Sequence, residues 1–117
     1  MPANDRDSAS LWDMAQAIRR IQQFTADASC DTYLESVFMQ SAVERQWGIL
    51  GEAAGESFEF QQFHPEIDWR NAINLRNILV HRYDQVRPEV IWNIVTSVLP
   101  GLLVQLEALL PPLPDDT

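Results

Sequence analysis

The stretch WRNAINLRNILVHRYDQVRPEVIW, residues 69–92, is the one around which the rest of this 117-residue chain can be organised. At its centre, the apolar triplet at 78–80 is bracketed by Arg76 and His81. A guanidinium is a permanent cation with planar donors that suit a phosphate, and an imidazole titrates near neutral pH. We therefore treat this stretch as the candidate functional site. We expect it to form a helix that its apolar triplet anchors in a core.

Helical spacing decides which of these side chains can meet. Asn77 and His81 are one turn apart on one face, where the amide can orient the imidazole. Arg76 and Tyr83 are seven residues apart and nearly in line, whereas Arg76 and His81 are about 140° apart around the axis, so that only a long arginine can bring both groups together. On an ordinary surface helix the same residues would be solvated, and His81 would be held by the C-terminal end of the helix dipole. Spacing alone leaves both interpretations open.

Length and composition indicate one small folded domain, 1–117. A hydrophobic content of 46% is typical of a globular chain with a modest core. We expect residues 1–7 and 111–117 to be flexible tails. The apolar runs are too short to span a bilayer, no signal-peptide pattern is present, and the single cysteine, Cys30, fits a reducing compartment. We therefore expect a cytoplasmic protein without a membrane partner.

The chain offers no pattern for a metal ion or a cofactor. Its two histidines, His64 and His81, have no cysteine or histidine neighbour at metal-ligand spacing. Neither a glycine-rich phosphate loop nor a Gly-x-Ser-x-Gly turn occurs. His64 precedes a proline and is expected to be a loop or packing residue. We expect neither metal nor cofactor.

Charge is distributed unevenly along the chain. The net charge is −9, and all eight basic residues are arginine. The window 70–87 holds four arginines and one acid, so it carries +3 and leaves −12 for the remainder. The whole molecule should repel RNA at long range, while the basic window can hold a phosphate. The acidic remainder suits ordinary solubility, and it also suits a basic protein partner.

Helical periodicity without strand alternation predicts an all-α fold, an up-and-down four-helix bundle. The first helix is expected from a cap at Ser8 or Ser10 to about residue 28. Its expected buried residues are Leu11, Met14, Ala15, Ile18 and Ile21. The second helix is expected from a cap at Asp31 or Thr32 to about residue 56. The residues expected to be buried in its first half are Leu34, Val37, Phe38, Ser41 and Ala42. Small residues at 48, 51 and 53 predict that another helix approaches closely.

Two further helices complete the expected bundle. A loop over 58–65 with three phenylalanine anchors should lead to a third helix, which starts at Trp69 and carries the candidate site. The fourth helix should begin with Pro88 in its first turn and kink at 100–101. Its apolar residues, from 90 to 110, form a surface wider than one stripe. Such a surface predicts either a very central helix or a subunit interface.

Three segments, in order along the chain, carry a family resemblance: ILGEAAG (49–55), HPEIDWRNAINLRNILVHRY (64–83) and PEVIWNIV (88–95). Together they resemble the HepT-like branch of the HEPN ribonuclease toxins, over roughly residues 10 to 110. The motif at the centre of the resemblance is Arg-Asn-x-x-x-His-x-Tyr, here Arg76, Asn77, His81 and Tyr83. One position departs from the pattern, since Arg82 stands where many relatives carry an acid.

The resemblance implies a dimeric HEPN-like bundle that acts as a metal-independent RNA endonuclease, the toxin of a type II or type VII toxin–antitoxin pair. Cleavage would use the 2′-OH of the RNA itself. His81 would act as general acid or base, Arg76 would hold the scissile phosphate, and Asn77 would support them. Tyr83 would receive AMP from a cognate minimal nucleotidyltransferase antitoxin, which would silence the toxin.

Two alternatives accompany this interpretation. Glu52, at a position that the family tends to keep acidic, would support the site, or it would join Arg45 in a surface or interhelical salt bridge. For the whole chain, the alternative is a non-catalytic helical dimer that only binds a nucleotidyltransferase partner. The acidic surface fits that alternative, and the intact motif argues against it.

Overall fold

The computed structural model of the chain describes residues 5–56, 58–70, 73–74, 76–77 and 87–110. The helices named within them are α1 (Asp5–Thr25), α2 (Cys30–Glu35), α3 (Val37–Glu56), α4 (Phe58–Phe63), α6 (Pro88–Ser97) and α7 (Leu99–Leu109). Short helical pieces also occur at 69–70, 73–74 and 76–77. No strand occurs in these described ranges, so the predicted all-α class is confirmed.

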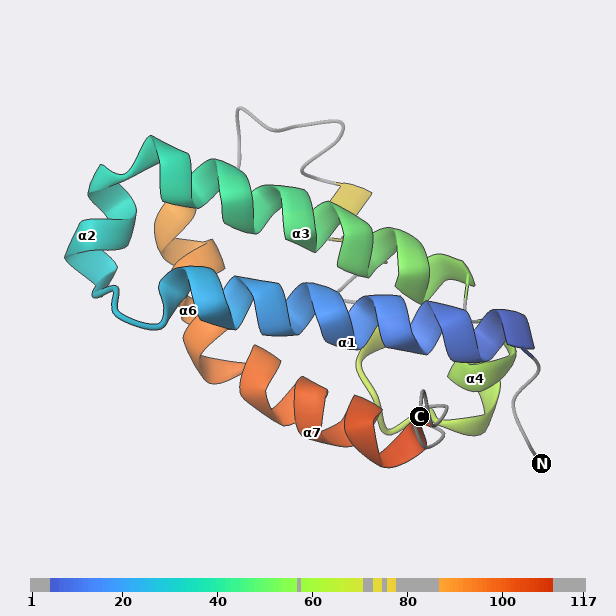
Figure 1. The fold of residues 1–117 in the computed structure, drawn as a ribbon. Helices are drawn as coiled ribbons and strands as arrows, with labels where there is room; N and C mark the ends of the chain where they lie inside the picture. The colour runs from blue at the N-terminus through green and yellow to red at the C-terminus, as the bar shows by residue number, and fades with distance from the viewer. Residues whose placement is uncertain (1–4, 57, 71–72, 75, 78–86, 111–117) are drawn as a thin grey trace, which may run out of the picture.

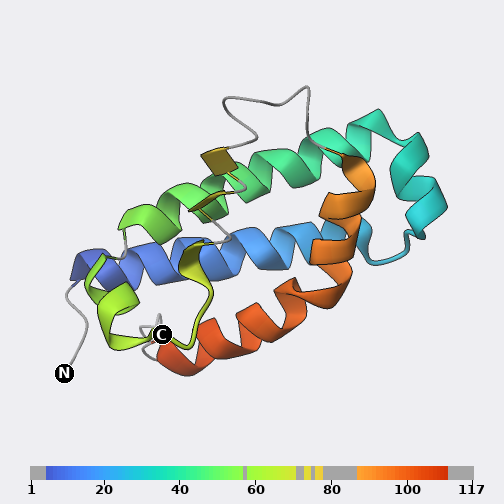
Figure 2. The same ribbon diagram turned by 180° about the vertical axis from the view of Figure 1, so that it is seen from behind.

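The central element is α1, which packs chiefly against α3 and also against α7. Both neighbours run antiparallel to it, on opposite sides (Figure 1). At one end of the bundle α2 contacts α6, and at the other end α4 lies beside the start of α1. Figure 2 shows α6 leading from the α3 side of the bundle, past α1, to α7. The helices thus form the expected up-and-down arrangement.

The core is built on the face of α1 that the sequence predicts. Its five expected residues are fully buried: Leu11, Met14, Ala15, Ile18 and Ile21. Opposite them, α3 and α7 bury mainly aliphatic residues and one indole: Val43, Trp47, Leu50, Ala54, Leu99, Leu102 and Leu106. Because each large apolar side chain contributes about 1.5–3 kcal/mol when removed from water, this interface is the main source of stability.

The ends of α1 differ from the prediction. The helix already includes residues 5–7, and Ser10, expected as a cap, is buried inside it. At the other end the helix stops at Thr25, whose hydroxyl donates to the Ile21 carbonyl oxygen at 2.8 Å. The predicted tail at 111–117 lies outside the described residues.

The predicted second helix is two helices, separated at Ser36. The cap of α2 is Ser29, two residues before the expected Asp31. Ser29 and Thr32 form a capping box. The Thr32 N–H donates to Ser29 Oγ at 3.2 Å, and the Ser29 N–H donates to Thr32 Oγ1 at 2.8 Å. The Ser36 N–H donates to the Tyr33 carbonyl oxygen, while its hydroxyl accepts from the Met39 N–H at 3.0 Å. Such local bonds compete with a continuous helix and allow the chain to turn here.

The stripe predicted for the first half of that helix is wrong. Val37 is 74% exposed and Phe38 is 87% exposed, while Leu34 and Ser41 are also exposed and Ala42 is half-buried. The buried face of α3 begins only at Val43. The short helix α2 instead buries Tyr33, whose ring lies 5.3 Å from that of Trp92. Leu34, Val37 and Phe38 together are called the α2–α3 corner below.

A close approach of another helix was predicted at the small residues of α3. A side chain added at Gly48 would meet nothing within 4 Å, so the helix contact predicted there is absent from the described part of the chain. Gly51 and Ala53 are buried, as a packed face requires.

The expected loop over 58–65 is also corrected, since α4 fills most of it. Phe63, expected as an anchor, is 66% exposed.

The last predicted helix is bent. Pro88 sits in the first turn of α6 as expected, and α6 and α7 meet at an angle of 48°. The break lies at Val98, just before the predicted site at 100–101, because Pro100 is accommodated in the first turn of a new helix where no N–H is needed. No single helix in the described ranges is long and apolar enough to cross a membrane, and only the bent pair α6–α7, taken together, has that length and composition.

Candidate functional site

The site segment is anchored at its start by Trp69. This indole is 5% exposed, and its Nε1–H donates to the His64 carbonyl oxygen at 2.9 Å. The same oxygen accepts from the Ile67 N–H at 3.2 Å, and the Trp69 N–H donates to the Ile67 carbonyl oxygen at 3.0 Å. His64 thus acts through its backbone in a tight turn, while its Nδ1 lies 3.1 Å from Glu66 Oε2. The expectation of a loop residue is confirmed, and the turn fixes where the site segment begins.

Arg76 and Asn77 are neighbours in a helical piece of this segment. The Arg76 Nη1–H donates to Asn77 Oδ1 at 3.3 Å. Arg76 is half-buried and Asn77 is exposed. Among the residues that the structure describes, no carboxylate forms an ion pair with Arg76. An arginine guanidinium can donate two parallel hydrogen bonds to an anionic ligand.

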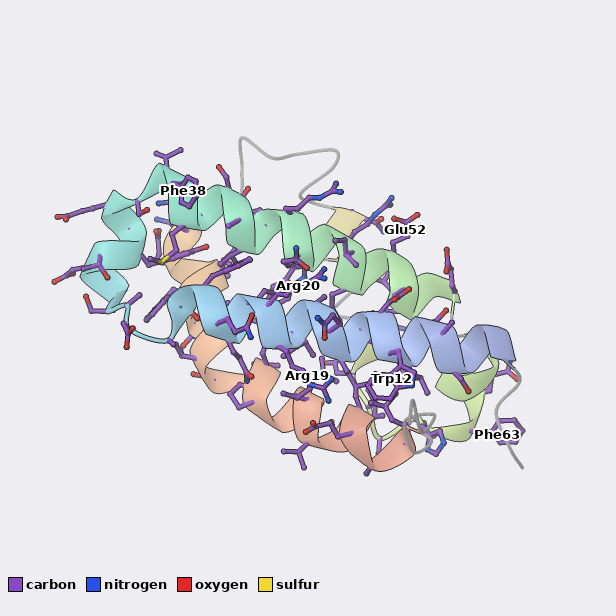
Figure 3. All side chains as sticks on the ribbon, in the orientation of Figure 1. Trp12, Arg19, Arg20, Phe38, Glu52 and Phe63 are labelled. Carbon is purple, nitrogen blue, oxygen red and sulfur yellow. The ribbon has the colours of Figure 1, made fainter. Side chains whose placement is uncertain are left out.

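The piece at 76–77 lies beside the C-terminal half of α3, on the side away from α1, in both views (Figures 1 and 2). Glu52 belongs to this half of α3, is exposed, and points outward from the helix (Figure 3). Arg45 is exposed on the same helix. Within the described residues neither forms an ion pair, so the salt bridge considered for them is not observed there.

The remaining motif residues, His81 and Tyr83, and the departing Arg82 lie outside the described residues. The roles expected for them stay predictions. In the described part of the chain, no group of three or more histidine, cysteine or acidic side chains is arranged to hold a metal ion.

The shifted titrations lie away from the motif, where α2 meets α3. Burial raises the pKa of the Tyr33 phenol far above its usual value, and the neighbouring Glu44 charge adds to the shift. Burial also raises the pKa of Glu44 itself. Both shifts follow from desolvation, which disfavours a charged group. These two pKa shifts result from the packing of α2 against α3, and neither residue belongs to the window 70–87 that carries the candidate site.

A cavity of about 690 Å³ opens beside the site segment and was missed by the sequence analysis. Its polar lining residues are Gln61, Glu66, Asp68, Arg70 and Asn74. Its apolar lining residues are Pro65, Ile67, Trp69 and Ile73. The only signal in the sequence was the presence of Arg70 and Asn74 within the candidate stretch. The helical fold of 58–63, which supplies one wall, was not expected.

Comparison with known proteins identifies the family of this chain. The family model described as ribonuclease HepT-like matches residues 14–109. A probable ribonuclease HepT from Thermococcus cleftensis is 36% identical over 100 residues, which cover 85% of this chain and 91% of that protein. A putative RNase from Methanocaldococcus jannaschii is 32% identical over 111 residues, 94% of this chain and 91% of that protein. No solved structure matches the chain. The matched family is the one that the three segments resemble, and the chain belongs to the HepT-like ribonuclease family.

Proposed function

We propose that this chain is a metal-independent RNA endonuclease whose reaction uses the 2′-OH of the substrate. The observation that carries the proposal is Arg76: a half-buried arginine within the family motif, whose guanidinium donates to Asn77 and forms no ion pair with a described acid. Such a guanidinium can donate two parallel hydrogen bonds to the scissile phosphate. The +3 charge of the window 70–87 supports binding of the backbone there, although the molecule as a whole is acidic.

The proposed reaction is a transesterification at phosphorus. A base removes the proton of the 2′-OH, the 2′ oxygen bonds to phosphorus, and the bond from phosphorus to the 5′ oxygen breaks. The leaving 5′ oxygen takes up a proton and becomes a 5′-hydroxyl. The other product is a 2′,3′-cyclic phosphate. His81 is the proposed general acid or base, typically worth about 10²–10⁴-fold in rate. Arg76 stabilises the charge that develops on the pentacovalent phosphorus.

Two residues are proposed to support these groups. Asn77 already bonds to Arg76, and it would also orient the imidazole of His81 or contact the phosphate. Glu52 extends from the part of α3 that flanks the 76–77 piece (Figure 3). From there its carboxylate would help to position the guanidinium when RNA is bound.

A homodimer is proposed because one histidine per chain is few for a reaction that needs both a base and an acid. A two-fold axis would bring two motifs into one cleft. Exposed apolar side chains offer two faces for the partner copy: the α2–α3 corner, and the exposed valines of the last helices, Val90, Val98 and Val104. Large apolar side chains exposed close together are typical of interaction sites, and those of the α2–α3 corner lie within five consecutive residues.

Regulation is proposed to act on Tyr83, in a toxin–antitoxin pair of type II or VII in the cytoplasm. A cognate minimal nucleotidyltransferase would transfer AMP from ATP to the phenol oxygen and release pyrophosphate. The added phosphate would place negative charge near Arg76 and occupy the path of the RNA. The acidic surface of the chain suits a partner with a basic docking face.

Substitution of the proposed acid–base residue tests the function. Wild type and His81→Ala are compared on single-stranded RNA in the presence of a chelator. We expect the variant to lose about 10²-fold or more in cleavage rate, with unchanged helical circular dichroism. Equal rates in nuclease-free preparations would contradict the role of His81, and loss of wild-type activity in chelator would contradict metal independence.

The alternative is a non-catalytic helical dimer that only binds a nucleotidyltransferase. The net charge of −12 outside the window 70–87 favours it, because that charge opposes RNA binding. Tyr83→Phe helps to separate the two functions: it should keep RNA cleavage and gain no AMP from the partner, as read by intact-protein mass spectrometry. A wild-type protein that binds its partner but never cleaves RNA would establish the alternative.

A further inference from the structure

We propose that the cavity beside the site segment is a subsite for one unpaired nucleobase of the RNA, and that it selects guanine. The inference rests on the proposed ribonuclease function and names how that site would choose its substrate. The cavity volume of about 690 Å³ lies within the range of small-molecule pockets, about 300–1,000 Å³.

The apolar part of the cavity suits the flat faces of a base. Pro65 is exposed and Ile73 is half-buried, so these two lining residues can offer apolar surface to a base. Ile67 and Trp69 also line the cavity, and at 3% and 5% exposure their positions are set by the core. The hydrogen bonds from Ile67 and Trp69 to the His64 carbonyl oxygen hold this turn in place. Gln61, another lining residue, donates from Nε2 to the Ala54 carbonyl oxygen at 2.6 Å, which ties α4 to α3. These contacts form the cavity before any ligand arrives, which lowers the entropic cost of binding.

The polar part of the cavity suits a base edge better than a phosphate. Among the described lining residues, Glu66 and Asp68 oppose the cation Arg70, so their formal charges sum to −1. A phosphate would be repelled by such a lining, whereas a neutral base that carries both donors and acceptors would not. Unpaired bases of RNA are commonly recognised in this way, through their Watson–Crick and Hoogsteen edges and an apolar contact to their faces.

Guanine fits the mixture of groups best. Its N1–H and N2 amino group are adjacent donors, which a carboxylate accepts in pairs, and these match Glu66 or Asp68. Its O6 and N7 are acceptors that an arginine recognises with two parallel hydrogen bonds, which matches Arg70. Asn74 adds an amide at the same cavity. Adenine, cytosine and uracil lack the adjacent pair of donors.

The cavity also lies at the right place along the chain. Arg70 and Asn74 belong to the segment that continues to Arg76 and Asn77. Asn74 and Asn77 are three residues apart, so their Cα atoms are separated by no more than about 11 Å even in a fully extended chain. A base held in the cavity would therefore belong to a nucleotide close to the phosphate that Arg76 binds.

Binding of short RNAs tests the subsite without catalysis. The probes are single-stranded oligouridylates with one central guanosine, adenosine or cytidine, and the uridine-only control, all bound to His81→Ala protein and measured by fluorescence anisotropy. We expect the guanosine probe to bind about tenfold more tightly than the others. The double variant Glu66→Gln, Asp68→Asn should lose this preference, and its melting temperature is measured alongside because Glu66 also contacts His64 Nδ1 at 3.1 Å. Glu89→Gln, a change of an exposed acid on α6 outside the cavity, is the matched control and should keep the preference.

The possible results separate this inference from the proposed function. Equal affinity for all four probes, or a guanosine preference that survives the double variant, would overturn the subsite. If the double variant loses stability, Arg70→Met provides the second test: it should also reduce the guanosine preference, and an unchanged preference would overturn the subsite. Cleavage of RNA by wild type without enrichment of guanosine near the cut would overturn the subsite alone. Failure to bind or cleave any of the RNAs would overturn both the subsite and the ribonuclease.

Discussion

Two apolar stripes of this chain look alike in sequence and differ completely in structure. The stripe on α1, which includes Ile18, is fully buried against α3, whereas the α2–α3 corner exposes Phe38 at 87% and Val37 at 74%. Helical spacing correctly states which residues share a face. It does not state whether another helix covers that face. The difference shows that the chain buries one apolar stripe in its own core and leaves the other, at the corner, exposed.

The largest expected effect is on the free energy of unfolding, which should fall strongly for a substitution in the α1 stripe and hardly at all for one at the α2–α3 corner. Ile18→Ala removes a fully buried side chain and should lower the free energy of unfolding by about 2–5 kcal/mol. Phe38→Ala should change it by no more than about 0.5 kcal/mol, because the ring is already in water. Urea denaturation at low protein concentration, where assembly contributes least, measures both. A loss of several kcal/mol for Phe38→Ala would contradict the exposed position of the corner.

The next largest expected effect is on dimer formation, and it tests whether the α2–α3 corner is the interface between two copies of the chain. Phe38→Glu should raise the dimer dissociation constant by on the order of tenfold or more, because large apolar residues dominate such interfaces. Val104→Glu, the matched change at an exposed valine of α7, probes the second face proposed for the partner copy, and it should leave the dimer intact if the corner alone forms the interface. Light scattering reports the mass against 13.4 kDa for one chain. A wild type with the mass of one chain would reject the dimer, and a dimer split only by Val104→Glu would move the interface to α7.

The capping box of α2 gives a smaller effect. Ser29→Ala removes the side chain that accepts from the Thr32 N–H, and should destabilise the protein by about 1 kcal/mol. Ser41→Ala, an exposed serine inside α3, is the control and should be neutral or slightly stabilising, since alanine favours a helix. Thermal unfolding of both variants decides whether α2 needs its cap to hold Tyr33 in the core. Equal melting temperatures would show that it does not.

The smallest expected effect is a pH dependence of stability that arises from Glu44 of α3. Its raised pKa means that the folded state binds the proton more tightly, so stability falls as the pH rises from the usual range of a glutamate through the raised pKa. Glu44→Gln should therefore be slightly more stable than wild type at neutral pH, by no more than about 0.5 kcal/mol. The difference should vanish in acid, where both side chains are neutral. A gap that persists at low pH would contradict the assignment to desolvation.

Sequence reasoning was reliable where a local rule and the tertiary fold agreed. The face of α1, the all-α class and Pro88 in the first turn of α6 were all predicted from periodicity and backbone chemistry. The break at Ser36 was missed because a serine in an apolar-periodic stretch gives no strong signal, and its effect depends on side-chain bonds to Met39. The mistaken stripe at 34–42 follows from that missed break.

The candidate site was predicted less completely. Arg76 and Asn77 were identified from their motif, but the hydrogen bond between them was not predicted, since Asn77 was expected to orient His81 or contact the phosphate. The cavity was not foreseen, since it is formed by α4, by the turn at His64 and by Arg70 together, and no spacing rule connects those three parts of the chain. The expected roles of His81 and Tyr83 remain predictions.

The central claim is that this chain cleaves RNA through the 2′-OH, without a metal ion. The most direct test incubates the wild type with a single-stranded RNA in excess chelator and identifies the fragment ends by mass spectrometry. The account predicts fragments that end in a 2′,3′-cyclic phosphate, or its hydrolysed phosphate, and begin with a 5′-hydroxyl, while DNA of the same sequence stays intact. Fragments with a 5′-phosphate and a 3′-hydroxyl, or cleavage that appears only when a divalent metal is added, would contradict it.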